Sequence, residues 1–255
     1  MTMGPKEISL IAMDNTNGNT CTGMFSGCTS LVEAPEIKAT TARDYCCDAM
    51  FYGCTAMTKT QETLYMTVIS GTNVFHNMFC NCKSLVKGPE IIVSEFKNGM
   101  YGNNNTYTFQ YMFAGCTSMT GATASLPALD LSPSANCYEG MFSGCTSLVN
   151  PPELPATILS KYCYRQMFAG CTSMKKSPDL MVTSVTASDA YASMFSGCTS
   201  LNYIKCMAVN QDQYPIVMSG WVIGVSSTRT FVKSPSATWA TGVAGIPNNW
   251  TVEDA

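Results

Sequence analysis

Seven near-copies of one octapeptide constrain this chain more than any other feature of its sequence. Each copy begins with the pair Met-Phe, and the pairs start at positions 24, 50, 78, 112, 141, 167 and 194. The spacings between them are 26, 28, 34, 29, 26 and 27 residues. A recurrence at roughly 20–50 residues indicates a solenoid, in which each unit buries its apolar face against its neighbours. The sequence therefore predicts a stack of seven such units.

The anatomy of one unit is visible in TARDYCCDAMFYGCTAM (41–57). Cys46 and Met50 lie four residues apart, a spacing that predicts a short helix before each Met-Phe pair. Gly53 follows where helices often end in a left-handed residue; six units have Gly at this position and the seventh has Asn81. A short extended run then predicts a strand parallel to its neighbours, near 30–34, 56–60, 84–88, 118–122, 147–150, 173–177 and 200–207. The expected fold class is an α/β repeat solenoid.

The motif also resembles a known repeat family. Its spacing F-x-x-C-x-x-L-x-x-A resembles the F-x-x-L-x-x-L-x-x-L of leucine-rich repeats, with Cys in place of one Leu. The run MFSGCTSLVEAPE is similar to the BspA-type leucine-rich repeats of bacterial surface proteins and of related proteins in gut Bacteroidales and their phages. The ending TFVKSPSATWATGVAGIPNNWTVED also resembles the end of such proteins. The resemblance covers residues 20–255 and implies a leucine-rich-repeat-like stack.

The repeats divide the chain into three regions. Residues 1–20 precede the first complete unit and are expected to form an N-terminal cap or leader. Residues 21–207 hold the seven units. Residues 208–255 depart from the repeat and carry all three tryptophans, so they are expected to form a C-terminal cap that covers the open end of the core.

The cysteines are abundant, with 14 in the chain and one in every copy of the motif. Neighbours in one column of a solenoid lie about 5 Å apart with parallel side chains, whereas a disulfide needs Cβ atoms within about 4.5 Å that face each other. The column cysteines are therefore expected to be small buried residues. Cross-unit disulfides, such as one between Cys21 and Cys47, remain an alternative if the environment is oxidising, although the same geometric objection applies to them. With His76 as the only histidine and no C-x2-C spacing, we expect no metal and no cofactor.

The composition narrows the function classes. Charged residues make up 12% of the chain, about half the usual share, and the net charge is −3 with no basic stripe, so nucleic acid is not an expected partner. No apolar run reaches about 18 residues, so no transmembrane segment is expected. The start MTMGPKEISLIAMD lacks the charged and then apolar organisation of a signal peptide.

Candidate binding residues fall in two groups. Acids that follow prolines form a possible ligand-binding ridge on the strand side, although a solvated edge would give the same pattern. An Asn- and Gly-rich insertion at 95–109 predicts a protruding loop, although a tolerated insertion would look the same. With the exposed aromatics added, the candidates are Glu36, Glu90, Glu153, Met100, Tyr101, Tyr107 and Tyr203.

The chain carries no nucleophile elbow, P-loop, dinucleotide fingerprint or histidine-based motif, so we expect no enzymatic activity. A long repetitive surface favours a recognition or adhesion module that binds a glycan, or a surface protein of a host or bacterium. The alternative is a structural virion component, such as a fibre or decoration protein of a phage that infects gut Bacteroidales. The expected location is extracellular, at the cell surface, or on the virion exterior.

Overall fold

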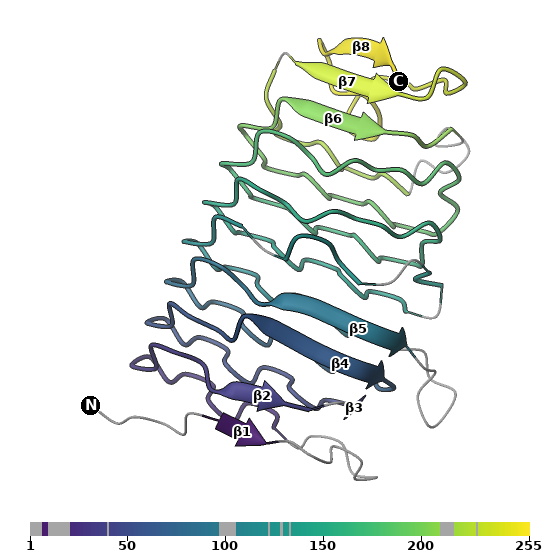
Figure 1. Cartoon of the computed structure of the whole chain (residues 1–255). Helices are drawn as coiled ribbons and strands as arrows, with labels where there is room; N and C mark the ends of the chain where they lie inside the picture. The colour runs from purple at the N-terminus through teal and green to yellow at the C-terminus, as the bar shows by residue number, and fades with distance from the viewer. Residues whose placement is uncertain are drawn as a thin grey trace.

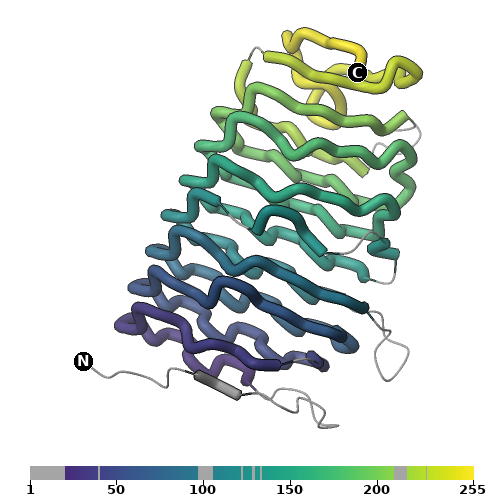
Figure 2. Tube along the Cα trace, in the orientation of Figure 1, coloured from purple at the N-terminus to yellow at the C-terminus, as the bar shows by residue number. Residues whose placement is uncertain are grey.

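The computed structural model describes most of the chain as one stack of flattened coils (Figures 1 and 2). The described residues are 7–9, 21–39, 41–96, 106–121, 123–127, 130–132, 134–209, 217–227 and 229–255. Each coil contributes to two layers. The strand layer holds the segments that follow each motif, such as 57–69, and the turn layer holds the segments that contain the Met-Phe pairs, such as 43–54. None of the described residues belongs to a helix long and apolar enough to cross a membrane.

All pairing among the described residues of the strand layer is parallel, which confirms the predicted stack of parallel strands. The sheets have the orders β1-β2, β3-β4-β5 and β6-β7-β8. Their bounds are β1 (Glu7–Ser9), β2 (Glu36–Lys38), β3 (Thr41–Ala42), β4 (Thr63–Ile69), β5 (Glu90–Phe96), β6 (Tyr203–Cys206), β7 (Thr230–Lys233) and β8 (Thr251–Asp254). At most of the predicted strand positions only single residues pair, for example Glu33 with Lys59 and Lys87 with Gly121.

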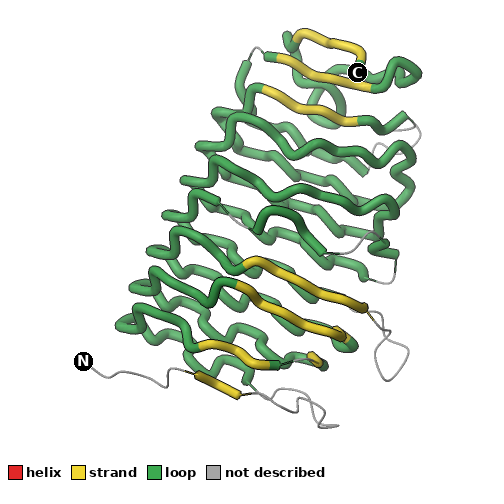
Figure 3. The backbone as a smooth tube through the Cα atoms, viewed as in Figure 1, coloured by secondary structure: helices red, strands yellow, loops and turns green. Residues whose placement is uncertain are grey.

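The turn layer contains no helix among the residues that the structure describes, so the predicted short helices and the α/β, leucine-rich-repeat-like character are not confirmed (Figure 3). Consecutive tight turns replace the helices. The N–H of Asp48 donates to the carbonyl of Tyr45, that of Met50 to Cys47, and that of Tyr52 to Ala49. The residues between them donate to the next coil, as Ala49 does to the carbonyl of His76. Every backbone donor of 45–54 therefore has a partner, within its coil or in the next one.

Left-handed residues make these turns possible. Three residues per coil, four positions apart, have positive φ, such as Tyr45 (55°), Ala49 (50°) and Gly53 (69°). Each is the third residue of a turn, where a type II turn requires positive φ. The predicted left-handed conformation is confirmed at the motif glycines and at Asn81 (φ 61°), although these residues join turns and do not end helices.

The turns also explain why the sequence looked helical. Along 161–171 the side chains alternate in pairs, two buried and two partly exposed, with a period of four residues. Residues four apart therefore share a face, as they nearly do in a helix with about 3.6 residues per turn. Cys46, Met50 and Cys54 are consequently all buried on the inner face of one coil.

Aromatic rings fill the core as two stacks that run along the solenoid. The phenylalanines of the motif are stacked from coil to coil at centroid distances of 5.3–5.9 Å, in the order Phe25, Phe51, Phe79, Phe113, Phe142, Phe168 and Phe195. A second stack contains Phe75, Phe109, Tyr138, Tyr164 and Tyr191, at 5.4–6.0 Å. Offset stacks at these separations add to the energy of burial.

The column cysteines have a more specific role than the predicted filling of space. The thiol of Cys54 donates to the carbonyl of Phe25 in the preceding coil (3.1 Å), and that of Cys145 donates to Phe113 in the same way (3.1 Å). The same carbonyl of Phe113 also accepts the N–H of Cys116, so both of its lone pairs are used. All 14 cysteines are free, and only Cys28, in the first described coil, is exposed; the prediction that the whole column is buried is wrong there.

The turn layer continues beyond the last motif. Gly220 (φ 62°) and Gly224 (φ 75°) repeat the left-handed positions of Ser193 and Gly197, and Trp221 stands where the motif has Met. The ring of Trp221 contacts those of Phe195 and Trp239 at 5.9 and 5.7 Å. The strand layer continues in register through β7 and β8.

Candidate functional site

The predicted site residues do not form one cluster. Glu36 lies in β2 and Glu90 begins β5, where its carboxylate accepts the N–H of Ala124 (3.1 Å). Glu153 and Tyr203 lie two coils apart in the strand layer, with 175–181 between them, and Tyr203 begins β6. Tyr107 belongs to the turn layer, on the other side of the coil from the acids, and Met100 and Tyr101 lie outside the described residues.

The strand layer is interrupted near Glu153, as it also is, over a shorter stretch, between 58–61 and 86–89. No backbone hydrogen bond joins 149–155 to 175–181, two segments that are both fully described. The interfaces on either side are bonded: Val149 donates to Thr120 on one side, and Ser177 donates to Tyr203 on the other. The two coils remain joined in the turn layer, where Gly144 donates to Ala169.

Proline is one cause of this gap. In the first coils the N–H of Ala34 donates to the carbonyl of Lys59, and Ser177 makes the equivalent bond to Tyr203. The residue at this position in the interrupted segment is Pro151, which has no N–H to donate. The N–H of Lys175 and the carbonyl of Val149, whose equivalents in neighbouring coils are bonded, have no partner among the described residues. The sheet therefore opens between two adjacent coils.

A shallow groove of about 490 Å³ occupies the opening. Four prolines contribute to its walls, at positions 151, 152, 155 and 178. Val149 and Met181 also line it and are strongly exposed, with 47% and 55% of their surface accessible. This size lies within the range of about 300–1,000 Å³ typical of ligand pockets. The apolar walls and unpaired backbone together form a surface suited to an extended ligand.

Of the charged side chains around the groove, some are paired with one another and one is unpaired. Asp179 is shared between Lys176 (3.5 Å) and Lys205 (3.6 Å). The ammonium of Lys176 also lies 5.1 Å from the centre of the Tyr203 ring, in a cation–π contact. Glu153 is exposed, and its carboxylate contacts no partner among the residues that the structure describes. The groove therefore has one unpaired carboxylate, that of Glu153, near a cluster of two lysines and one aspartate that carries one net positive charge.

One polar group in the groove is buried without a partner. Ser177 lines the groove and is only 2% exposed, and its hydroxyl makes no hydrogen bond. A buried hydroxyl without a partner costs about 1–3 kcal/mol. A ligand group that reached this hydroxyl would remove that cost.

The buried thiols offer no reactive group here. Burial raises the pKa of Cys82 and of Cys198 to about 12, with the neighbouring Cys54 thiol contributing at Cys82. A thiol is a nucleophile only as the thiolate, and these thiols are protonated at neutral pH. Within the described part of the chain, no three His, Cys, Asp or Glu side chains gather in a way that could hold a metal ion.

Sequence reasoning identified Glu153, which lines the groove, and Tyr203, whose ring contacts Lys176, but it missed the groove itself. The prolines at 151, 152 and 178 were the available signal, because each marks a strand position that cannot donate a hydrogen bond. No family model, no curated protein and no solved structure matches this chain.

Proposed function

We propose that this protein is a non-enzymatic recognition module that binds an extended segment of a surface protein in the strand-layer groove. The observation that carries the proposal is the absence of backbone hydrogen bonds between 149–155 and 175–181. Unpaired strand edges bind extended peptides through main-chain hydrogen bonds, and adjacent pockets select alternate side chains. The likeness of the repeat to BspA-type surface proteins supports a role in attachment.

Each part of the groove has a counterpart in such a ligand. The carbonyl of Val149 would accept a peptide N–H, and the N–H of Lys175 would bind a peptide carbonyl. The exposed side chains of Val149 and Met181 would contact an apolar side chain of the peptide. Glu153 would pair with a Lys or Arg beside it, since its carboxylate lacks a partner here. The preferred ligand is therefore an extended segment in which apolar and basic residues alternate.

The test is selection from a display library of short linear peptides against the full chain. We expect enrichment of sequences that alternate apolar and basic residues. Met181→Ser and Glu153→Gln should each lower the affinity for the selected peptides about tenfold, which corresponds to about 1.4 kcal/mol. Glu36→Gln is the matched control, because Glu36 is an exposed acid of the same layer outside the groove.

Pro151→Val provides a second test with the opposite effect on stability. Valine restores the N–H that the equivalent residues Ala34 and Ser177 use to bond the next coil. Closing the ladder should raise the urea midpoint of unfolding and, in the same variant, weaken the binding of the selected peptides. Failure to enrich any peptide, or equal losses from Glu36→Gln and Glu153→Gln, would contradict the proposal.

A further inference from the structure

The outward surface of the turn layer carries a regular aromatic pattern that is independent of the groove. In the first of the three left-handed columns, tyrosine alternates with an asparagine or aspartate from coil to coil. The column contains Tyr45, Asn73, Tyr107, Asn136, Tyr162 and Asp189, all with φ between 54° and 61°. A tyrosine therefore recurs on this surface at every second coil.

The tyrosines are unexpected in this conformation. Asparagine and aspartate enter the left-handed region readily, whereas a bulky side chain there is an outlier. Burial compensates for this strain only in part, because Tyr45 and Tyr107 remain 40% and 38% exposed and Tyr162 is partly exposed. The tyrosines of the core stack, by contrast, are fully buried. Strained residues that stay partly exposed occur at ligand-binding sites.

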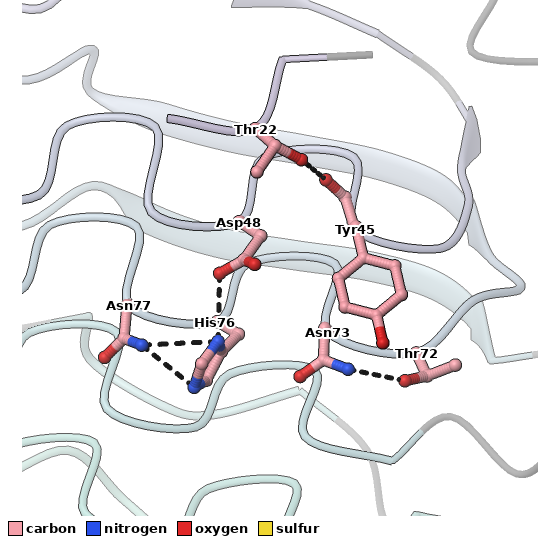
Figure 4. Close-up of polar contacts among 7 residues, drawn as sticks. All are labelled: Thr22, Tyr45, Asp48, Thr72, Asn73, His76 and Asn77. Carbon is pink, nitrogen blue, oxygen red and sulfur yellow. Dashed lines mark hydrogen bonds and ion pairs between the residues drawn. The ribbon is translucent and has the colours of Figure 1, made fainter. Parts of the chain in front are cut away.

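A second column, three residues further along each coil, holds polar side chains, of which Glu139 is buried and Asp48 and His76 are largely buried. Its members are Asp48, His76, Gln110, Glu139 and Arg165. Contacts within the column hold them in place: Asp48 and His76 are 2.9 Å apart, and Gln110 donates to Glu139 at 2.8 Å. Figure 4 shows the first part of this surface, with Asn77 bonded to the His76 ring. Such fixed side chains lose little freedom when they bind a ligand.

We propose that this surface binds a linear, uncharged, β-linked glycan that runs along the solenoid across successive coils. Sugar rings present C–H faces that pack on aromatic rings, and hydroxyls that pair with planar amides and carboxylates. In an extended β-1,4-linked glycan such as cellulose or mannan, successive rings alternate in orientation, so equivalent faces recur at every second sugar. The tyrosines recur at every second coil, roughly 10 Å apart given about 4.8 Å between neighbouring strands. The repeat of the tyrosines along the solenoid therefore corresponds to the repeat of equivalent sugar faces along the glycan.

The charges of the surface favour a neutral chain. The two acids of the second column are paired where they stand, the buried Glu139 with Arg165 and the largely buried Asp48 with His76. Arg165 lies 3.8 Å from Glu139, and both Lys161 and Arg165 lie over the Tyr162 ring. No single sign of charge dominates that would select an acidic or a basic polymer.

The test uses the full chain and three β-linked polysaccharides, namely cellulose, xylan and β-mannan, with α-linked dextran as the negative polymer. We expect binding to at least one β-linked polymer and none to dextran. The triple variant Tyr45→Asn, Tyr107→Asn and Tyr162→Asn should lose at least tenfold in affinity. Its melting temperature should hold or rise, because asparagine already occupies this column at Asn73 and Asn136.

Tyr65→Asn is the matched control, since Tyr65 is an exposed tyrosine of β4 in the strand layer. It should leave glycan binding unchanged. Three outcomes would overturn the proposal: no binding to any of the β-linked polymers, a triple variant that binds as tightly as the original chain, or a triple variant with a clearly lower melting temperature. The last outcome would show that the tyrosines stabilise the fold. It would contradict the inference that their backbone conformation is strained without a compensating gain in stability. The groove variants Met181→Ser and Glu153→Gln should not affect this binding, so the two proposals fail separately.

Discussion

Truncating Phe142 should be among the most damaging single changes in this protein. Phe142 is fully buried and stacked between Phe113 (5.6 Å) and Phe168 (5.7 Å). Phe→Ala in a core costs about 3–5 kcal/mol, and each stacked pair adds about 0.5–1.5 kcal/mol. Because Phe142 has two such neighbours, we expect Phe142→Ala to lower the free energy of unfolding by about 5 kcal/mol.

Two further variants separate stacking from burial. Phe142→Leu keeps most of the apolar burial and loses both stacked contacts, so it should cost about 2 kcal/mol. Phe25 is only partly buried and has one stacked neighbour, Phe51, so Phe25→Ala should also cost about 2 kcal/mol. Urea unfolding followed by circular dichroism gives all three values. Equal losses for Phe25→Ala and Phe142→Ala, or a Phe142→Leu variant as stable as the original chain, would refute the stacking argument.

Other consequences of the fold can be measured directly. A thiol reagent at pH 8 should label Cys28 rapidly and the thirteen buried cysteines only on unfolding, as mass spectrometry of the modified peptides would show. The raised pKa values of Cys54 (about 11) and Cys198 (about 12) contribute stability that is complete below the unfolded thiol pKa of about 8.5. This contribution is lost as pH rises from about 9 to 12, so the urea midpoint should fall over that interval. Gly53→Ala should cost about 1–2 kcal/mol from its positive φ alone, whereas Gly140→Ala should cost more, because its Cβ would contact the Tyr111 ring; a smaller loss for Gly140→Ala would contradict this geometry. Cys145→Ser should be tolerated better than Cys145→Ala, because a hydroxyl can still donate to the Phe113 carbonyl. The urea midpoint of the Ser variant should therefore be the higher of the two.

The repeat alone predicted the stack and its parallel pairing, because near-regular spacing of closely similar motifs leaves few other arrangements. It did not predict the turn layer correctly. Cys46 and Met50 share a face whether the period is 3.6 or 4, and a unit spans too few residues for the two periods to separate. Additional left-handed residues, such as Tyr45 and Ala49, were the missing information. Side chains of those types do not indicate positive φ from sequence.

The sites were less predictable than the fold. Pro151 marks a place where the ladder can fail, but which pair of coils separates depends on the alignment of two segments about 26 residues apart. The alternation of Tyr45, Tyr107 and Tyr162 becomes visible only when the coils are aligned, because these residues lie outside the octapeptide. The additional coil after the last motif also escaped notice, since Trp221 and Val222 replace the Met-Phe pair and only Gly220 and Gly224 keep the pattern.

The hydrogen bonds between coils of the turn layer all point the same way. In each of these bonds the earlier coil donates and the later coil accepts, from Phe25 to Met50 through Phe195 to Trp221. Neighbouring strands largely cancel their peptide dipoles, but these dipoles add along the solenoid. The layer therefore has a macrodipole with its positive end at the C-terminal coil, opposite in direction to that of an α-helix relative to the chain. A negatively charged group would be stabilised near Val222 and Gly224, and a positively charged group beside the first coil.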